Sequence, residues 1–483
     1  MKKRILAALV ASAAVLSMAG CNGNNASDSN TPASNNGGDS NTPASNNGGD
    51  NSTPDSNGGE DSTPTFEYTA PATDLTDEDN KLSIGIWTGN GDYNNLINYF
   101  KEVTGTTVEI VPVSGGAEGG DARDGYKTLM EDNSVDLDLI ICDTDWVRNY
   151  VSTDEFCADL STLGINKADY KDAYSYTLGV GTGDDGVLRG VSFQATPGCW
   201  FYNTRLAKEH LGVETPEQMQ EMVKDWDTFN ETAKKLKEAT SGSVALTCTE
   251  GGVWQVYQCK RSQPWVVDGK LVMDNAEDFF DIAKNLYDNG GLTDLAQWDP
   301  MWGTSMQDDA AIGEFASSWG LTGLTGSILG DIAGEARRDG DAEYAAVAGP
   351  AEWYWGGSYF CVTNKCNTKK TAFEFINFYT LNADTMAGYT AKTGDFMNNK
   401  TVMNNASYKN PSLVGGQDHL KVIAPTAEKI DMDGKLTTYD SRIKELLNDH
   451  VKDYMTGKIA TKDEAIQQFK DAVKAEFTAI TVE

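Results

Sequence analysis

The sequence predicts a body of the α/β class, built on a parallel sheet and preceded by a long segment that does not fold. Three observations lead to this prediction. Strand and helix patterns alternate over 81–143, residues 22–65 hold no aromatic side chain and repeat themselves, and no low-complexity linker interrupts 81–483. Alternating strands and helices predict a parallel sheet with helices on its faces. The body is therefore expected to be one continuous unit of about 400 residues.

The first 20 residues have the pattern of a secretion signal. They have a basic start, an apolar stretch from Ile5 to about Ala19, and small residues before Cys21. The apolar stretch is too short for a comfortable membrane span. The ending Met18-Ala19-Gly20-Cys21 resembles a bacterial lipobox, so we expect Cys21 to be lipidated with palmitate and to anchor the protein at the outer face of the cell membrane. Ordinary signal cleavage, with Cys21 as a plain thiol, is the alternative.

Residues 21–66 are expected to be the lipidated cysteine and a disordered tether. The segment SNTPASNNGGD occurs twice, at 29–39 and 40–50, and a degenerate copy follows at 51–60. Such a composition cannot bury enough apolar surface to offset the entropy of ordering. The tether would hold the folded part, 67–483, away from the membrane, as through a Gram-positive cell wall. A solvating stalk without a positional role is the alternative.

The charge balance excludes whole classes of partner. Asp and Glu number 72 against 39 Lys and Arg, which gives a formal net charge of −33. Such a protein repels nucleic acid and anionic lipid surfaces, so membrane contact is expected only through the N-terminal lipid. The acidity also favours a neutral ligand. With only His210, His419 and His450 in the chain, a His-rich zinc site is disfavoured, and we expect no metal and no cofactor.

The body begins with strands and helices in alternation. Strands are predicted at 81–89, 106–113 and 135–143, and helices at 92–105 and 121–132. Ligands of parallel sheets sit beyond the carboxyl ends of the strands, where Trp87 and the cluster of Asp143, Asp145 and Trp146 are expected.

Helices dominate the rest of the body. After a helical stretch near 167–178 we predict a strand at 187–193, a Pro-Gly break and a helix from about Thr204; the stretch from Phe315 to Gly330 suggests a loop and a buried helix. Trp226 lies on the core-facing stripe of a helix at 225–240. The other predicted elements are a helix at 275–291, strands at 342–350 and 356–364, and helices at 369–382, 441–457 and 461–477.

Seven cysteines remain in the body, an odd number that leaves at least one thiol free. An oxidising location would permit bridges between sequence neighbours, and buried free thiols are the equal alternative. The neighbouring pairs are Cys142 with Cys157, Cys248 with Cys259, and Cys361 with Cys366, and Cys199 stands apart.

Three glycine-containing motifs are interpreted as turns or loops. GTGDDG at 181–186 precedes a strand, whereas a dinucleotide site needs this pattern after a strand and before a helix. The loop at 114–121 lacks the lysine of a phosphate-binding loop, and DMDGK at 431–435 lacks the closing glutamate of a calcium loop.

Tryptophan beside Gly, Asn or Asp is the strongest functional signal. Flat aromatic faces stack on the C–H faces of sugar rings, and Asp, Asn and Gln bond the hydroxyl groups, so this mixture suits a neutral oligosaccharide. Core packing is the alternative for each tryptophan. A glycoside hydrolase needs only two carboxylates, but no acidic pair stands in a recognisable catalytic motif. The tryptophans in question, besides those at the strand ends, include Trp200, Trp254, Trp302, Trp319 and Trp355.

Six segments in order resemble the family 1 extracellular solute-binding proteins, the maltose-binding-protein-like lipoproteins of carbohydrate ABC importers. The resemblance covers about 80–483. Its segments are TPGCWFYNTRLAKEHLG with DWDTFNETAKKLKEAT, RSQPWVVDGKLVMD, GEFASSWGL, GPAEWYWGGSYFCVTN, TAFEFINF and AKTGDFMNN.

The resemblance implies a two-lobed periplasmic-binding-protein-like fold of type II, in which each lobe is a sheet flanked by helices and the hinge is crossed more than once. The first lobe would span about 80–190 with a later segment, and the second about 200–345 with the C-terminal helices. The implied ligand site lies in the cleft. Its residues are Trp319 and Trp355 for stacking, Gly356 beside Trp355, Asp143, Asp145 and Trp146 as a wall, Trp87 and Asn90 at a strand end, Gln194 and Trp200 near the crossing, and Asp395.

The expected function is therefore that of a monomeric, non-enzymatic subunit of an ABC importer, which captures an oligosaccharide and delivers it to the permease and its ATPase by hinge closure. A cell-surface glycoside hydrolase and a polysaccharide-binding adhesin are the alternatives.

Overall fold

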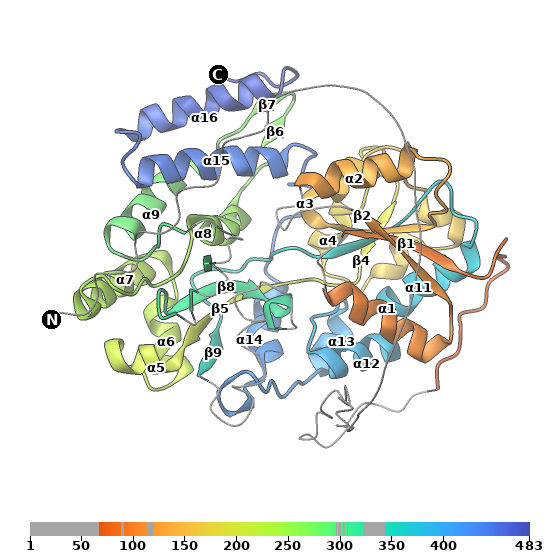
Figure 1. Cartoon of the computed structure of the whole chain (residues 1–483), viewed down its shortest axis with the longest axis horizontal. Coiled ribbons are helices and arrows are strands. Elements are labelled where there is room, and N and C mark those ends of the chain that lie inside the picture. Colours follow the sequence, from red (N-terminus) through yellow and green to blue (C-terminus); the bar gives the residue numbers. More distant parts are fainter. Residues whose placement is uncertain are drawn as a thin grey trace, which may run out of the picture. The chain divides into compact units, whose positions relative to one another are not determined.

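The computed structural model describes residues 67–87, 91–113, 120–295, 297, 301–302, 305–306, 308–321 and 343–483 (Figure 1). These residues belong to one compact unit that spans Glu60–Glu483. The signal segment and the tether predicted for 1–66 lie outside the described residues, as do Asn90 and the loop at 114–119. No helix among the described residues is both long enough and apolar enough to cross a bilayer.

A five-stranded mixed sheet organises the first lobe, with the order β2-β1-β3-β10-β4. β1 runs parallel to β2 and β3, whereas β10 lies antiparallel between β3 and β4. β1 and β3 are almost entirely buried, which explains their nearly continuous apolar sequences. The predicted parallel arrangement is confirmed for three strands. The strands are β1 (Leu82–Trp87), β2 (Val108–Val113), β3 (Leu139–Asp143), β4 (Gly190–Ser192) and β10 (Ser358–Val362).

Helices from both ends of the body cover this sheet (Figure 1). They are α1 (Gly91–Thr104), α2 (Gly120–Glu131), α3 (Thr144–Val151), α4 (Ser175–Val180), α11 (Lys369–Thr380), α12 (Ala383–Thr393) and α13 (Lys400–Asn405), with short 3₁₀ turns η1 (Leu160–Leu163) and η2 (Lys167–Tyr170).

A three-stranded antiparallel sheet, β8-β5-β9, organises the second lobe. It consists of β5 (Gly198–Asn203), β8 (Gly313–Ser317) and β9 (Tyr344–Val347). The sequence analysis predicted neither β5 nor β8. It passed from the Pro-Gly break directly to the helix at Thr204, where β5 lies between them, and it predicted a loop and a helix from Phe315, which belongs to β8. Pro197 precedes the central strand directly, a position that proline tolerates because it needs no ladder hydrogen bond there.

The second lobe is otherwise helical. Helix starts follow ordinary capping rules: the Asp225 side chain accepts from Thr228 N in a capping box, and Pro216 follows the Thr215 cap. The elements are α5 (Thr204–Leu206), the π turn η3 (Ala207–Leu211), α6 (Pro216–Val223), α7 (Trp226–Thr240), α8 (Glu250–Tyr257), η4 (Gln258–Lys260), the hairpin β6 (Val266–Val267) and β7 (Lys270–Leu271), α9 (Ala276–Asp288), η5 (Ser318–Leu321), η7 (Val414–Gly416), α14 (His419–Ala427), α15 (Asp440–Met455) and α16 (Lys462–Glu476).

The chain passes between the two sheets at 193–197, at 348–357 and at 406–418. The first two crossings are joined to each other, since Gly198 N donates to Trp353 O at 2.9 Å and Trp355 N donates to Thr196 O at 3.1 Å. Gln194 also bridges Met397, beyond α12. Several backbone segments therefore meet at one junction, as a hinge crossed more than once requires.

The seven cysteines of the body are buried free thiols, so none of the neighbouring bridges is formed. Cys142 on β3 and Cys361 on β10 lie in the smaller of two apolar clusters, within the first lobe, together with Cys157. Burial raises the pKa of the Cys142 and Cys361 thiols, and a hydrogen bond with Cys361 together with burial raises that of Cys157, which keeps all three protonated and unreactive.

Candidate functional site

One pair of tryptophans stands at strand ends of the first lobe. Trp87 is the last residue of β1, and Trp146 lies in the first turn of α3, directly after β3. Their rings meet edge to face, with the ring centroids 5.1 Å apart and an angle of 72° between the ring planes. Trp87 is half-buried, and the Trp146 ring nitrogen has no hydrogen-bond partner among the described residues. The first lobe thus holds an aromatic corner in which Trp87 is the more exposed member and Trp146 is 7% exposed.

A second pair stands where the second lobe meets the crossing at 348–357. Trp319 lies in η5, immediately after β8, and Trp355 lies in the crossing itself. Their ring centroids lie 5.1 Å apart with an angle of 85° between the ring planes, and Trp319 Nε1 donates to Trp355 O at 2.9 Å. The two side chains form a second, nearly right-angled aromatic corner.

The backbone at Gly356 and Gly357 joins the two pairs. Thr144 Oγ1 donates to Gly356 O at 2.7 Å, and Thr144 N donates to Gly357 O at 2.9 Å. Gly356 has a φ of 77°, and a Cβ there would lie 3.4 Å from Asp143 Oδ2 and 3.7 Å from Trp319 Nε1. Glycine is favoured at this position because the backbone conformation is left-handed and because both lobes approach it closely.

Two carboxylates border this junction. Asp143 caps α3 by accepting from Asp145 N at 2.8 Å. Burial, together with the charge of Asp145, raises the pKa of Asp143 to about 7. Asp145 forms an ion pair with Lys444 of α15. Each carboxylate thus has one oxygen engaged within the protein, Oδ1 of Asp143 by Asp145 N and Oδ2 of Asp145 by Lys444.

Gln194 and Asp395 form a buried network under Trp319. Gln194 Nε2 donates to Asp395 Oδ2 at 2.5 Å, and Ser318 Oγ donates to Asp395 Oδ1 at 2.8 Å. Burial raises the pKa of Asp395 in spite of these bonds. The two residues predicted as ligand contacts are thus bonded to each other, and they position η5 and the crossing rather than line an open surface.

Three predicted tryptophans lie in the core. Trp200, in the middle of β5, is fully buried and stacks on Tyr202 at 5.7 Å and 9°. Trp254, inside α8, is fully buried and packs against Phe279, with the ring centroids 4.9 Å apart. Trp302 is 2% exposed. We leave these three side chains out of the site, because each packs within the second lobe and lies apart from the two corners.

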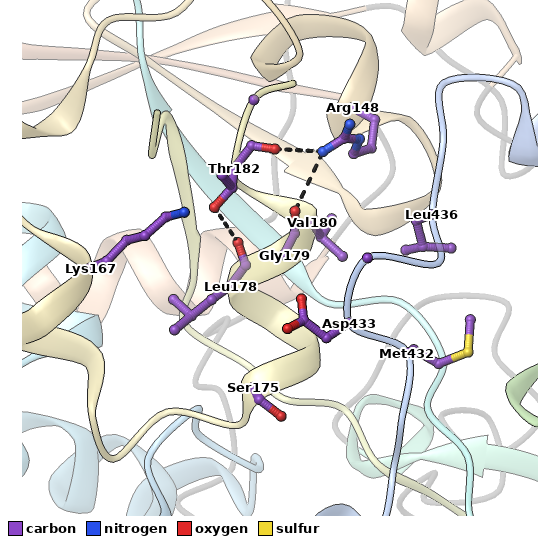
Figure 2. Close-up of a pocket in the computed structure, with 12 residues that line it drawn as sticks. Arg148, Lys167, Ser175, Leu178, Gly179, Val180, Thr182, Met432, Asp433 and Leu436 are labelled. Atoms are coloured by element: carbon purple, nitrogen blue, oxygen red, sulfur yellow. Dashed lines mark hydrogen bonds between the residues drawn. The ribbon is translucent and has the colours of Figure 1, made fainter. Parts of the chain in front are cut away.

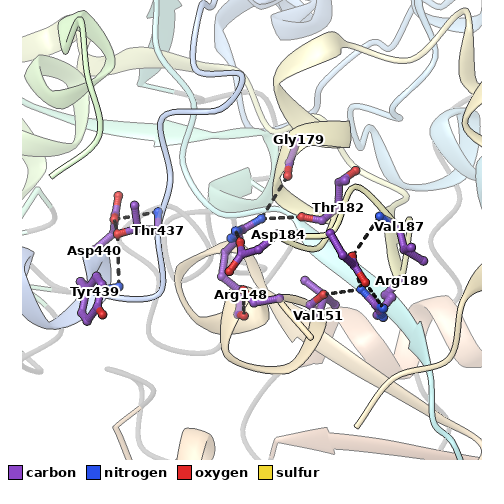
Figure 3. A network of polar contacts seen from close by, with 12 residues as sticks. Arg148, Val151, Gly179, Thr182, Asp184, Val187, Arg189, Thr437, Tyr439 and Asp440 are labelled. Atoms are coloured by element: carbon purple, nitrogen blue, oxygen red, sulfur yellow. Dashed lines mark hydrogen bonds and ion pairs between the residues drawn. The ribbon is translucent and has the colours of Figure 1, made fainter. Parts of the chain in front are cut away.

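Several residues that the sequence analysis missed surround the same junction. The rings of Tyr176, on α4, and Tyr354, in the crossing, pack together with their centroids 4.9 Å apart. Asp440, the first residue of α15, accepts from Thr437 N at 2.9 Å, and burial raises its pKa to about 6 (Figure 3). Lys444 follows one turn later. Lys444 carried no local signal, since its partner Asp145 is 299 positions away.

A separate cavity of about 460 Å³ lies between α4 and the turn before α15 (Figure 2). Its wall includes Arg148, Lys167 and Asp433 beside apolar side chains such as Leu178 and Leu436. None of the tryptophans that the structure describes lines it. The mixed charges favour no single ligand class, so this cavity does not replace the tryptophan corners as the candidate site.

The two turn motifs flank this cavity, and both form turns, as predicted. In the turn at 181–186, Asp184 pairs with Arg148 and Asp185 pairs with Arg189 at 2.7 Å (Figure 3). The turn of DMDGK places Asp433 against α4, where a Cβ on Gly179 would lie 2.1 Å from its Oδ1. Both motifs are structural turns.

Comparisons with known proteins agree on one fold. A sequence profile described as "Bacterial extracellular solute-binding protein" matches residues 95–415. A crystal structure described as "Extracellular solute-binding protein family 1" has a TM-score of 0.65 at 16% identity and covers 81% of this chain and 99% of its own. No curated protein sequence matches the chain.

Two structurally similar proteins were solved with sugars. The ABC transporter associated binding protein from B. animalis subsp. lactis Bl-04, in complex with β-1,6-galactobiose, has a TM-score of 0.63 at 18% identity, with 84% of this chain and 99% of that chain covered. The galacto-N-biose-/lacto-N-biose I-binding protein from Bifidobacterium longum, in complex with lacto-N-biose, has a TM-score of 0.62 at 17% identity, with 83% and 98% covered. At such identities the likeness establishes the fold.

Proposed function

Since the chain belongs to the bacterial extracellular solute-binding proteins, we propose that it captures a neutral carbohydrate between its two lobes and delivers it to the permease of an ABC importer. The fold is the two-lobed type II periplasmic-binding-protein-like fold that the resemblance implied. One observation carries the proposal: Gly356 lies beside Trp319 and the raised-pKa carboxyl of Asp143, and its carbonyl accepts from Thr144, two residues before Trp146. It therefore links the edge-to-face pairs Trp319–Trp355 and Trp87–Trp146.

This arrangement suits a sugar for physical reasons. Indole faces take the apolar C–H faces of pyranose rings, and the Asp143 carboxyl offers an acceptor for a hydroxyl group. Two corners can hold more than one ring, so we propose an oligosaccharide. The net charge of −33 favours a neutral one.

The binding cycle follows from the fold. A sugar that contacts both lobes binds the closed state more tightly than the open state, so it shifts the population toward closure. Closure would then present both lobe surfaces to the permease and, through it, to the ATPase. We propose that the protein acts as a monomer, catalyses no reaction, and is held at the outer face of the membrane by a lipid on Cys21.

Isothermal titration with maltose, β-1,6-galactobiose and lacto-N-biose tests the binding step. We expect 1:1 binding of at least one sugar, which is recovered unchanged. Release of new reducing ends would indicate a glycoside hydrolase instead, and binding only to insoluble polysaccharide would indicate an adhesin. Incorporation of labelled palmitate into the wild-type protein, but not into Cys21→Ser, tests the anchor.

A further inference from the structure

Helix α15 belongs to the second lobe by its packing but contacts the first lobe with its polar face. Its buried side chains, Ile443, Leu446, Leu447, Val451 and Met455, face the core, and the helix runs beside α16 and α9 of the second lobe (Figure 1). Ser441, Lys444 and Glu445 lie on another face, at the spacing that places side chains of a helix side by side. We call these three residues the α15 clasp.

Each member of the α15 clasp bonds a helix of the first lobe. Lys444 forms an ion pair with Asp145 of α3. Arg123 of α2 donates to Ser441 Oγ at 2.7 Å and to Glu445 Oε1 at 3.2 Å. The Arg123 side chain is 21% exposed and that of Lys444 is 19% exposed, so solvent screens these contacts only in part.

We propose that the α15 clasp sets the affinity for sugar by stabilising the closed arrangement of the lobes, without itself contacting the sugar. The inference rests on the proposed function, in which closure accompanies binding. α2 and α3 pack on the first sheet, whereas α15 packs on helices of the second lobe. Any opening that separates the lobes at this edge therefore breaks both sets of contacts together, and the apparent affinity falls with the population of the closed state.

The clasp also revises the role of Asp145. The sequence analysis placed Asp145 among the ligand contacts, but the carboxylate oxygen Oδ2 is taken by Lys444 from the opposite lobe. Asp145 is therefore assigned to closure, and Asp143 remains the acceptor for the sugar. This assignment explains why two neighbouring acids can be present at the mouth of a site for a neutral ligand.

A neutral ligand makes the clasp measurable through salt. Binding of an uncharged sugar by stacking and hydrogen bonds depends little on ionic strength, whereas partly exposed ion pairs weaken as salt rises. The affinity of the wild-type protein is therefore expected to fall between 50 mM and 500 mM NaCl, and this loss reports the charged part of the clasp.

The test compares Arg123→Gln with Lys462→Gln. Lys462 of α16 pairs with Asp281 of α9 at 2.6 Å and is 28% exposed, but both partners belong to the second lobe, so this variant removes a similar ion pair without affecting closure. The probe is whichever of maltose, β-1,6-galactobiose and lacto-N-biose binds the wild-type protein most tightly. We expect Arg123→Gln to weaken binding about three- to tenfold at 50 mM NaCl and to reduce the salt dependence, and Lys462→Gln to change neither.

Two further measurements separate the clasp from the proposed function. Arg123→Gln combined with Glu445→Gln should weaken binding no more than Arg123→Gln alone, because the two residues act as one contact. Small-angle scattering without sugar should show a larger radius of gyration for Arg123→Gln than for Lys462→Gln. If no sugar binds the wild-type protein, the proposed function fails while scattering still decides on the clasp. Equal radii of gyration for Arg123→Gln and Lys462→Gln would overturn the proposed role of the clasp. So would an affinity and a salt dependence of Arg123→Gln that match those of the wild-type protein.

Discussion

The tryptophans of the two corners and those of the second-lobe core differ in where they stand on the backbone. Trp87, Trp146 and Trp319 lie at the end of a strand or in the turn directly after one. Trp200 lies in the middle of β5 and Trp254 in the middle of α8. A side chain within an element is committed to the core that the element covers, whereas one at an element's end can face a cleft. The position relative to a strand end therefore separates these three side chains from Trp200 and Trp254, whereas Trp355 lies in the crossing just before β10.

The largest expected effect tests the core side of this comparison. Trp254→Ala should lower the free energy of unfolding by about 3–5 kcal/mol, because it leaves a cavity against Phe279 and Trp265. Urea unfolding followed by circular dichroism measures the loss. Trp355→Ala should cost less than half as much. Equal losses in the two variants would show that Trp355 is as much a core residue as Trp254.

The cleft side is tested by affinity. Trp355→Ala and Trp319→Ala should each weaken sugar binding about tenfold or more, since the apolar contact between one indole and a sugar ring is worth about 1.5 kcal/mol. Titration calorimetry with the best-binding sugar of the panel measures the change. Trp226→Phe, on the core-facing stripe of α7, is the matched control and should leave affinity unchanged. Unchanged affinity in both alanine variants would remove the second corner from the site.

The same comparison shows how much of the fold the sequence could predict. β1 and β3 were found because they are covered on both faces and so form apolar runs between helices. β2, which is largely exposed, was found by its β-branched residues. β5 was missed because Pro197 and Gly198 suggest a break, although the strand begins at Gly198 itself. The antiparallel insertion of β10 beside β3 depends on a return of the chain from the other lobe, about 200 residues later, and no local pattern encodes it.

The candidate site was predictable in the same uneven way. Trp87, Asp143 and Trp146 were identified because each follows a strand, and such positions meet at one edge of a sheet. Lys444 was not, because a lysine on an amphipathic helix suggests a solvated face. Only the packing of the lobes brings it to Asp145.

A smaller effect is expected at the hinge. Thr196, in the first crossing, has a φ of 46° and a buried hydroxyl without a partner among the described residues. This conformation is strained for a β-branched residue, so Thr196→Gly should be more stable than Thr196→Ala by about 1 kcal/mol. At Thr232, buried inside α7, the order should be reversed, since glycine weakens a helix by about 1 kcal/mol relative to alanine. Urea unfolding of the four variants compares the two sites, and the same order at both would contradict a strained hinge.

The smallest effect concerns two acids, one in each region. The pKa is raised to about 7 for both Asp143, beside the tryptophan corners, and Glu314, in the second-lobe core, by burial first of all. Because the folded protein holds these protons more tightly than the unfolded chain does, each acid destabilises the fold increasingly as the pH rises from about 4 to 7. Asp143→Asn and Glu314→Gln remove that cost, so their melting temperatures should exceed that of the wild-type protein at pH 8, and the difference should shrink toward pH 5. Saturating sugar should alter the dependence of melting temperature on pH for Asp143→Asn and leave that of Glu314→Gln unchanged, because only Asp143 borders the proposed ligand. An identical response of the two variants to sugar would place Asp143 outside the site.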